Sequence, residues 1–162
     1  MSALRRSVTS TEGMKAAFSI AELVIVVCII GILAAIVLPT FQNNATEAKI
    51  ATAKDNLRVL RSVVELYAVN HKDVPPGYPG DNPNTDPTSE DFLQQTTVDE
   101  TYLRSVPRNP FNNLSTIDML TNHEALPSEA TGDFGWIYKP SNRTVRLDWP
   151  GQDPKGVRYF DY

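Results

Sequence analysis

The chain has 162 residues, of which 41% are hydrophobic and 21% charged, so it is neither a disordered polyelectrolyte nor too short to bury a core. Its formal net charge is −4 and its basic residues are scattered, so we expect no nucleic-acid partner. A single cysteine, Cys28, excludes an internal disulfide and a cysteine-based zinc site.

The N-terminal part consists of a polar segment followed by an apolar block. Residues 1–17 carry three basic side chains against one carboxylate, a net charge of +2. Residues 23–38 contain no charge, and the apolar run extends back to Phe18 with Glu22 as its one charged member. As a helix this block would measure about 31 Å, close to the hydrocarbon thickness of a bilayer. The basic flank favours a cytoplasmic N-terminus, with the rest of the chain translocated.

Three interpretations of this block compete. An ordinary membrane anchor accounts for its length alone. A secretory signal peptide fits poorly, because the apolar stretch is longer than usual and carries a carboxylate near its start. The third interpretation starts from Glu22, since a charge inside a membrane helix costs roughly 2.5–3.5 kcal/mol and usually has a partner. If the chain were cut before Phe18, the new α-ammonium of the same or a neighbouring copy would neutralise this carboxylate.

The segment Ala17-Phe-Ser-Ile-Ala-Glu22, with Gly31 and Pro39 beyond it, resembles the class III leader and N-terminal helix of type IV pilins and type II secretion pseudopilins, above all the major, G-type pseudopilin. In that family a prepilin peptidase cuts before a phenylalanine and methylates the new amine. A glutamate and a proline stand at the fifth and twenty-second mature positions, as Glu22 and Pro39 do here. The resemblance implies cleavage between Ala17 and Phe18, N-methylation of Phe18, and assembly roles for Glu22, Gly31 and Pro39.

The resemblance also implies a location and partners. The protein would cross the inner membrane once with its N-terminus in the cytoplasm, and its soluble domain would be periplasmic, or extracellular after assembly. Its partners would be membrane lipid before assembly, the prepilin peptidase, an inner-membrane assembly platform, minor pseudopilins, and further copies in a homo-oligomeric filament. Two residues depart from the pattern: Ala17 stands where glycine is usual, and Ala21 where a larger aliphatic residue is common. Met14 offers a second start.

Helical periodicity resumes after Pro39. Apolar residues recur at spacings of three and four, which predicts an amphipathic helix over about residues 40–70 with one buried stripe and a charged, solvated opposite face. The stripe comprises Ile50, Ala53, Leu57, Leu60, Val64 and Tyr67. One helix from Phe18 to Asn70, bent at Pro39 because proline removes a backbone donor, is the simplest account. It should end near His71, since prolines follow shortly.

Residues 73–133 are rich in proline and polar side chains, which predicts loops with one short helix from about Ser89 to Gln95. Three strands are expected after this region, over residues 135–139, 144–149 and 157–162. The first is aromatic and branched between turn signals, the second alternates between apolar and polar residues, and the third follows a turn at residues 150–156.

Together these elements predict an α+β pilin fold, in which a long N-terminal helix packs on a small C-terminal antiparallel sheet. The expected domains are a leader (residues 1–17), a transmembrane and assembly helix (18–38) and a soluble domain (39–162), whose sheet occupies about residues 134–162. The aromatic strand after Gly135 and the segment from Tyr102 to Phe111 also resemble the pseudopilin family, although more loosely than the leader does.

No catalytic motif stands out. His71 and His123 are the only side chains that titrate near neutrality when unperturbed, and both fit solvated positions. The sequence contains no nucleophile elbow, zinc-protease pair or phosphate-binding glycine loop. We therefore expect that the protein is not an enzyme.

One cofactor remains open. Asp148, Asp153 and the carbonyls of the turn at residues 150–156 offer oxygen ligands, which calcium prefers. The resemblance implies the same ion, since major pseudopilins carry a calcium-binding loop near this end. This loop is shorter and has fewer aspartates, so a plain acidic turn is the alternative.

The sequence thus predicts a structural subunit of a type II secretion pseudopilus or type IV pilus-like filament. Two alternatives stay open: an uncleaved membrane-anchored binding module, and a minor pilin of a DNA-uptake or adhesion machine.

Overall fold

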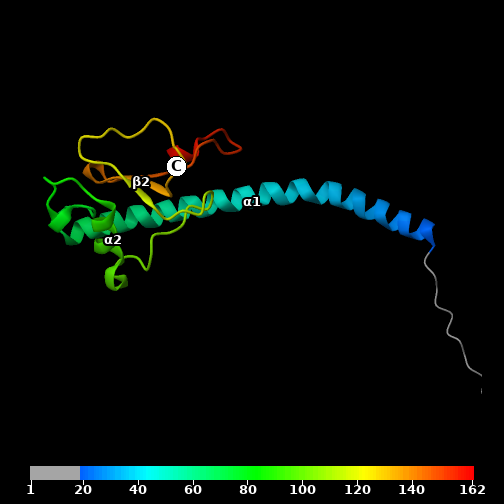
Figure 1. Ribbon diagram of the computed structural model, residues 1–162, viewed down its shortest axis with the longest axis horizontal. Coiled ribbons are helices and arrows are strands. Elements are labelled where there is room, and N and C mark those ends of the chain that lie inside the picture. Colours follow the sequence, from blue (N-terminus) through cyan, green and yellow to red (C-terminus); the bar gives the residue numbers. More distant parts are fainter. Residues whose placement is uncertain (1–18) are drawn as a thin grey trace, which may run out of the picture. The chain divides into compact units, whose positions relative to one another are not determined.

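The longest element of the computed structural model is helix α1, which runs from Ile20 to Asn70 (Figure 1). The structure describes residues 19–162, without the side chains of residues 37–43. The chain divides into two units, residues 1–43 and residues 44–162, and α1 contributes residues to both.

Helix α1 buries one stripe of its second half, as the sequence predicts. Ala53, Leu57, Leu60, Val64 and Tyr67 are all buried, and Ile50 packs against them. The spacing of three and four places these side chains on one face, where they lose contact with water. The predicted stripe is therefore confirmed, and it forms the helical side of the core.

The predicted end of α1 is also confirmed. Asn70 is its last residue, and Lys72 follows in the left-handed conformation with a φ of 55°. The N–H of Asp73 donates to the carbonyl of Ala68 at 2.8 Å, the bond that defines a Schellman C-cap. Two prolines then prevent the helix from continuing.

The predicted short helix is present as α2, Ser89–Thr97. Thr88 caps its N-terminus, because the threonine Oγ accepts a hydrogen bond from the N–H of Asp91 at 3.0 Å. Phe92 and Thr96 point from α2 into the protein interior and are buried. Helix α2 thus begins one residue after its cap and extends two residues past the expected end.

The sheet has three short strands in the order β1-β2-β3. They are β1 (Ile117–Met119), β2 (Trp136–Lys139) and β3 (Thr144–Leu147). Strands β2 and β3 form an antiparallel hairpin through the 3₁₀ turn η3 (Pro140–Asn142), whereas β1 pairs with β2 in parallel. The α+β class is therefore confirmed, and the purely antiparallel sheet is corrected to a mixed one.

The expected last strand, residues 157–162, is wrong. Tyr159–Asp161 form the 3₁₀ turn η4, and the only ladder contact in this segment is an isolated bridge between Gln152 and Arg158. A 3₁₀ turn brings side chains three residues apart onto one side, and Tyr159 and Tyr162 meet there with ring centroids 5.7 Å apart. The segment follows a period of three, so its aromatic residues pack in a 3₁₀ turn and not in a strand.

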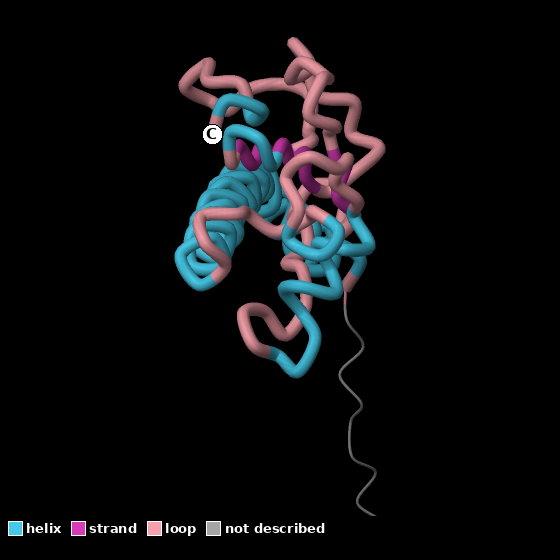
Figure 2. The backbone as a smooth tube through the Cα atoms, turned by 90° about the vertical axis from the view of Figure 1, so that its left-hand side faces the viewer, coloured by secondary structure: helices cyan, strands magenta, loops and turns pink. Residues whose placement is uncertain are grey.

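Within the unit of residues 44–162, the sheet lies beside the second half of α1 (Figure 2). Trp136, Tyr138 and Leu147 from the strands join Leu57 and Leu60 of α1 in one core cluster. The indole N–H of Trp136 donates to the carbonyl of Pro107 at 2.8 Å, so its polar edge is paired although the side chain is fully buried. A second, smaller cluster lies around Leu120, Ile137 and Phe160.

Candidate functional site

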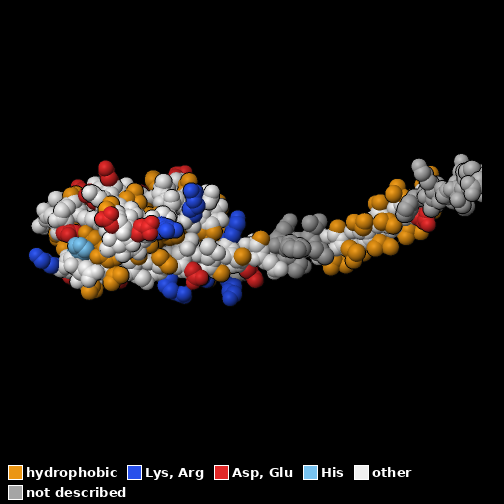
Figure 3. All heavy atoms as spheres, turned by 90° about the horizontal axis from the view of Figure 1, so that it is seen from below, with side chains coloured by type: hydrophobic (Ala, Val, Ile, Leu, Met, Phe, Trp, Pro, Cys, Tyr) orange, Lys and Arg blue, Asp and Glu red, His pale blue; other side chains and the backbone are white. Residues whose placement is uncertain are grey.

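The first half of α1 presents apolar side chains to its surroundings. Every residue from 19 to 36 is exposed, including Leu23, Ile25 and Ile30, each more than half exposed. Figure 3 shows these apolar side chains gathered along the helix. Such a continuous exposed apolar surface is uncommon on a solitary water-soluble protein and typifies interaction surfaces.

No helix in the part of the chain with described side chains combines the length and apolarity needed to cross a membrane. The predicted span at residues 18–38 extends beyond that part at both of its ends.

Glu22 lies at the start of this surface and has a partner within the chain. Its carboxylate accepts a hydrogen bond from the backbone N–H of Ser19 at 2.9 Å, and the Ser19 Oγ accepts one from the N–H of Ala21 at 3.2 Å. These bonds form a variant of the capping box, in which the Glu22 carboxylate accepts from the N–H of Ser19 while the Ser19 hydroxyl accepts from the N–H of Ala21 instead of that of Glu22. The partner of Glu22 within the chain is therefore the N–H of Ser19, whereas the sequence analysis predicts the amine of Phe18.

Of the other residues predicted to act in processing and assembly, the structure fully describes only Gly31. Ala17 and Phe18 lie outside the described residues, as does the side chain of Pro39, so the cleavage site and the bend stay predictions. Gly31 is described and exposed, and a Cβ built on it would meet nothing within 4 Å. The fold of the single chain therefore does not require glycine at position 31.

Asp148, one of the two predicted calcium ligands, follows β3 and is fully buried. Its Oδ1 accepts hydrogen bonds from the N–H groups of Thr131 at 2.7 Å and Gly132 at 3.0 Å. Its Oδ2 accepts from the Thr131 hydroxyl and from the N–H of Phe134, both at 2.9 Å. Burial raises the pKa of Asp118, and the nearby negative charge of Asp148 raises it further.

Asp153, the other predicted ligand, lies in the turn after β3 and is also buried. Its Oδ1 accepts from the N–H groups of Lys155 at 2.8 Å and Val157 at 2.9 Å, and its Oδ2 accepts from the Tyr162 hydroxyl at 2.8 Å. The Val157 N–H and the Tyr162 hydroxyl stabilise the ionised form and lower the pKa of Asp153. Burial, and then the hydrogen bond that its hydroxyl donates to Asp153, raise the pKa of Tyr162.

These two carboxylates do not fit a calcium ion. The ion takes six to eight oxygen ligands, and carboxylates must turn their lone pairs toward it. Here the lone pairs of Asp148 and Asp153 already face protein donors. Across the described residues, moreover, no group of three or more His, Cys, Asp or Glu side chains could hold a metal.

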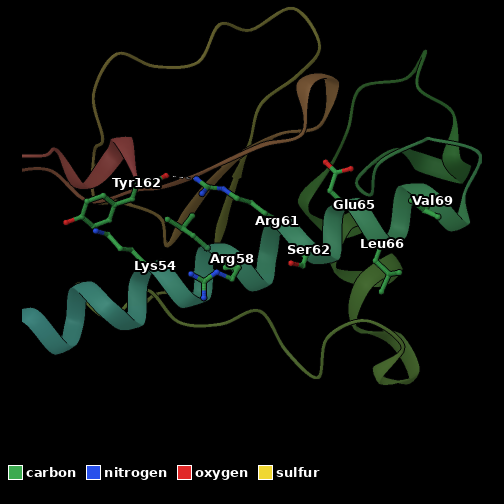
Figure 4. A pocket seen from close by; sticks show the side chains of 9 residues that line it. Lys54, Arg58, Arg61, Ser62, Glu65, Leu66, Val69 and Tyr162 are labelled. Atoms are coloured by element: carbon green, nitrogen blue, oxygen red, sulfur yellow. Dashed lines mark hydrogen bonds between the residues drawn. The ribbon is translucent and has the colours of Figure 1, made fainter.

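The charged face of α1 is not simply solvated. An open groove of about 810 Å³ runs along it and ends at Tyr162 (Figure 4). Arg61 donates from its guanidinium to the carbonyls of Val145 at 2.9 Å and Tyr162 at 2.5 Å. Arg143 pairs with Glu65 at 3.1 Å, so two charged residues of this face bind the helix to the sheet. Arg61 and Glu65 remain exposed, as predicted for this face, and the sequence could not show which residues of the sheet they bind.

The histidines occupy different surroundings. His71 is half-buried and stacks on Tyr67 with ring centroids 3.7 Å apart, whereas His123 is exposed. The solvated position expected for His71 is thus only partly realised, and its ring contributes to packing at the end of α1.

Curated relatives share part of the chain. It is 26% identical over 101 residues to the type II secretion system core protein G of Pseudomonas aeruginosa, covering 59% of this chain and 68% of that protein. It is 33% identical over 89 residues to fimbrial proteins of Neisseria meningitidis serogroups B and A, covering 55% of this chain and 47% of each of those proteins. The chain is similar to pseudopilins and type IV pilins.

The expected family resemblance is thereby confirmed. The match spans about half the length of the fimbrial proteins and about two thirds of core protein G. No protein-family model and no solved structure gives a significant match. The names of these relatives describe parts of a secretion system and of fimbriae, and neither is the name of an enzyme.

Proposed function

We propose that this pilin-like chain is a structural subunit of a filament, either a type II secretion pseudopilus or a type IV pilus-like fibre, and has no catalytic role. The observation that carries the proposal is the exposed apolar surface of α1 at residues 19–36, which contains one carboxylate at its start. The similarity to a secretion-system core protein and to fimbrial proteins supports the same reading.

Before assembly, the chain sits in the inner membrane with its N-terminus in the cytoplasm and residues 18–38 in the lipid. The basic leader favours this orientation. A prepilin peptidase then cuts between Ala17 and Phe18, and the new amine of Phe18 is methylated. The soluble domain stays on the periplasmic side, or reaches the cell exterior in the fibre.

In the filament, the helices of many copies pack against one another and bury the apolar side chains of α1. Outside the bilayer these side chains would face water, and each square ångström of apolar surface that packing keeps from water contributes about 25 cal/mol, so the bundle is stabilised relative to a subunit exposed to water. Apolar burial has no preferred direction, and it cannot by itself fix how neighbouring helices are aligned. That alignment is the role we assign to Glu22.

The capping box supports this role. Ser19 directs the Glu22 carboxylate toward the N-terminal end of α1, the end at which cleavage would create the amine of Phe18. A neighbouring copy aligned so that its own amine meets this carboxylate forms a charge-assisted bond, and a misaligned copy leaves a carboxylate unpaired among apolar groups. Gly31 and Pro39 allow the helix to adjust within the fibre, and the assembly platform and minor pseudopilins start it.

Replacing Glu22 tests the proposal. With the peptidase and the assembly platform co-expressed, Glu22→Ala and Glu22→Gln should still enter the membrane but yield about tenfold fewer sheared filaments, because each subunit loses a charge-assisted contact of about 1.5–3 kcal/mol. Glu22→Gln retains an oxygen that can accept from Ser19, so it separates the charge from helix capping.

Two control variants belong to this experiment. Glu47→Gln makes the same chemical change at an exposed site further along α1 and should leave the filament yield unchanged. Ser19→Ala removes the capping hydroxyl but keeps the Glu22 charge, and its loss should be smaller. Normal filaments from both Glu22 variants would overturn the alignment role.

A further inference from the structure

Two buried carboxylates, Asp148 and Asp153, accept hydrogen bonds from protein donors in the part of the chain after β1. A disulfide is excluded because Cys28 is the only cysteine of the chain. Calcium would need several oxygen ligands turned toward one point. What the structure contains instead is a set of protein donors on each carboxylate.

Asp148 accepts more hydrogen bonds than Asp153 does. A carboxylate has about four lone-pair positions, and its four hydrogen bonds, between 2.7 and 3.0 Å, occupy all of them. Three of the donors are backbone N–H groups of residues 131–134, a segment that lies 14 to 17 positions earlier in the chain. Asp148 therefore fastens the loop before β2 to the end of β3.

The surroundings of Asp148 hold it in place. The Asn109 side chain donates from Nδ2 to the carbonyls of Gly135 at 3.1 Å and Asp148 at 3.3 Å. Both Asn109 and Asp148 are fully buried, so neither can exchange its partners for water without opening the fold. An ion entering here would have to displace several backbone donors, which would then be buried without a partner.

Asp153 is the second buried carboxylate, and its hydrogen bonds close the turn that follows. It binds two N–H groups of its own turn and the hydroxyl of Tyr162. Lys54 lies over the ring of the same tyrosine, with its Nζ 4.1 Å from the centroid. The turn is thus connected through Tyr162 to helix α1.

We propose that Asp148 and Asp153 are hydrogen-bonded clasps that fold residues 131–162 without calcium, so that the stability of this protein does not depend on the ion. Protein donors supply the positive ends of dipoles at the two carboxylates, the role that a cation would otherwise fill. This inference concerns folding and stands whether or not the chain forms filaments.

The test is thermal unfolding of the full chain in detergent, in EDTA and in excess calcium. Tryptophan fluorescence reports locally, because Trp149 adjoins Asp148 and Trp136 lies in the core. We expect the two midpoints to agree within about 1 °C, and calcium titration calorimetry to give no saturable heat. A midpoint lower by about 5 °C or more in EDTA and restored by calcium would overturn the proposal, because saturating an ion site stabilises the native state by that order.

Variants provide a second test. Asp148→Asn replaces one acceptor oxygen by a donor, and its midpoint should fall equally in EDTA and in calcium, whereas a calcium ligand would lower it only in calcium. Asp133→Asn is the matched control, an exposed aspartate of the clasped loop, and should change neither midpoint. If Asp148→Asn does not fold, Asp153→Asn gives the same comparison, and a loss seen in calcium alone would contradict the clasps.

Discussion

At the scale of single residues, Gly135 occupies a position where any side chain would collide with the backbone. A Cβ built on it would lie 2.4 Å from the carbonyl oxygen of Leu114, which is backbone and cannot turn aside. Gly135→Ala should therefore destabilise the protein by about 2–4 kcal/mol, which urea unfolding would measure. Ser141→Ala, an exposed change in the turn at the other end of β2, should alter stability by less than about 0.5 kcal/mol. Equal stability of Gly135→Ala and the wild type would show that the backbone is further apart than described.

Asp153 makes a prediction about acid stability. Its pKa lies below the ordinary value of 3.8, because the Val157 N–H and the Tyr162 hydroxyl bind the ionised carboxylate. A lowered folded-state pKa adds stability above the unfolded-state pKa, and this contribution is lost as the pH falls through the folded value. Wild type should lose stability below about pH 4 more steeply than Asp153→Asn does, as urea midpoints across pH would record. Parallel curves would contradict this role.

Single residues also show which hydrogen bonds can be predicted from the sequence. The bond between Ser19 and Glu22 can be predicted, because both residues lie within one helical turn. The donors to Asp148 could not be predicted from the sequence, because they come from residues 131–134 and reach the carboxylate only when β2 and β3 form their hairpin. Side chains that accept local donors can be predicted from spacing, and those that accept distant donors cannot.

At the scale of elements, the two faces of α1 should respond differently to the same substitution. Leu60 is buried in the core, whereas Leu66 on the same helix is 53% exposed. Leu60→Ala should cost about 2–5 kcal/mol through lost burial and a residual cavity, and Leu66→Ala less than about 1 kcal/mol. Denaturant unfolding of the two variants checks this, and similar losses would contradict the assigned packing of α1.

The elements themselves were predictable where their period was clear. The stripe of α1 follows a period of about 3.6 and strand β3 a period of 2, while β2 is a short aromatic and branched run between turn signals. Strand β1 has only three residues in a polar region, and it becomes a strand because β2 offers it a pairing edge. The aromatic residues around Tyr159 suited a strand or a 3₁₀ turn equally well, and contacts with the core decide between them.

At the scale of the whole molecule, fold class and family resemblance came from the sequence, because both rest on long or closely spaced patterns. The mixed sheet and the contacts of Arg61 and Arg143 did not, because they depend on which segments meet across the protein. The proposed function joins both kinds of information. It requires an apolar helix that is released from a leader, and a soluble domain that packs on the second half of that helix.

The most direct test of the filament proposal is the intact mass of the protein extracted from membranes in which a prepilin peptidase is active. We predict a chain that begins at Phe18 and carries one additional methyl group. A chain that still begins at Met1 or Met14 would contradict the proposal and favour an uncleaved membrane anchor.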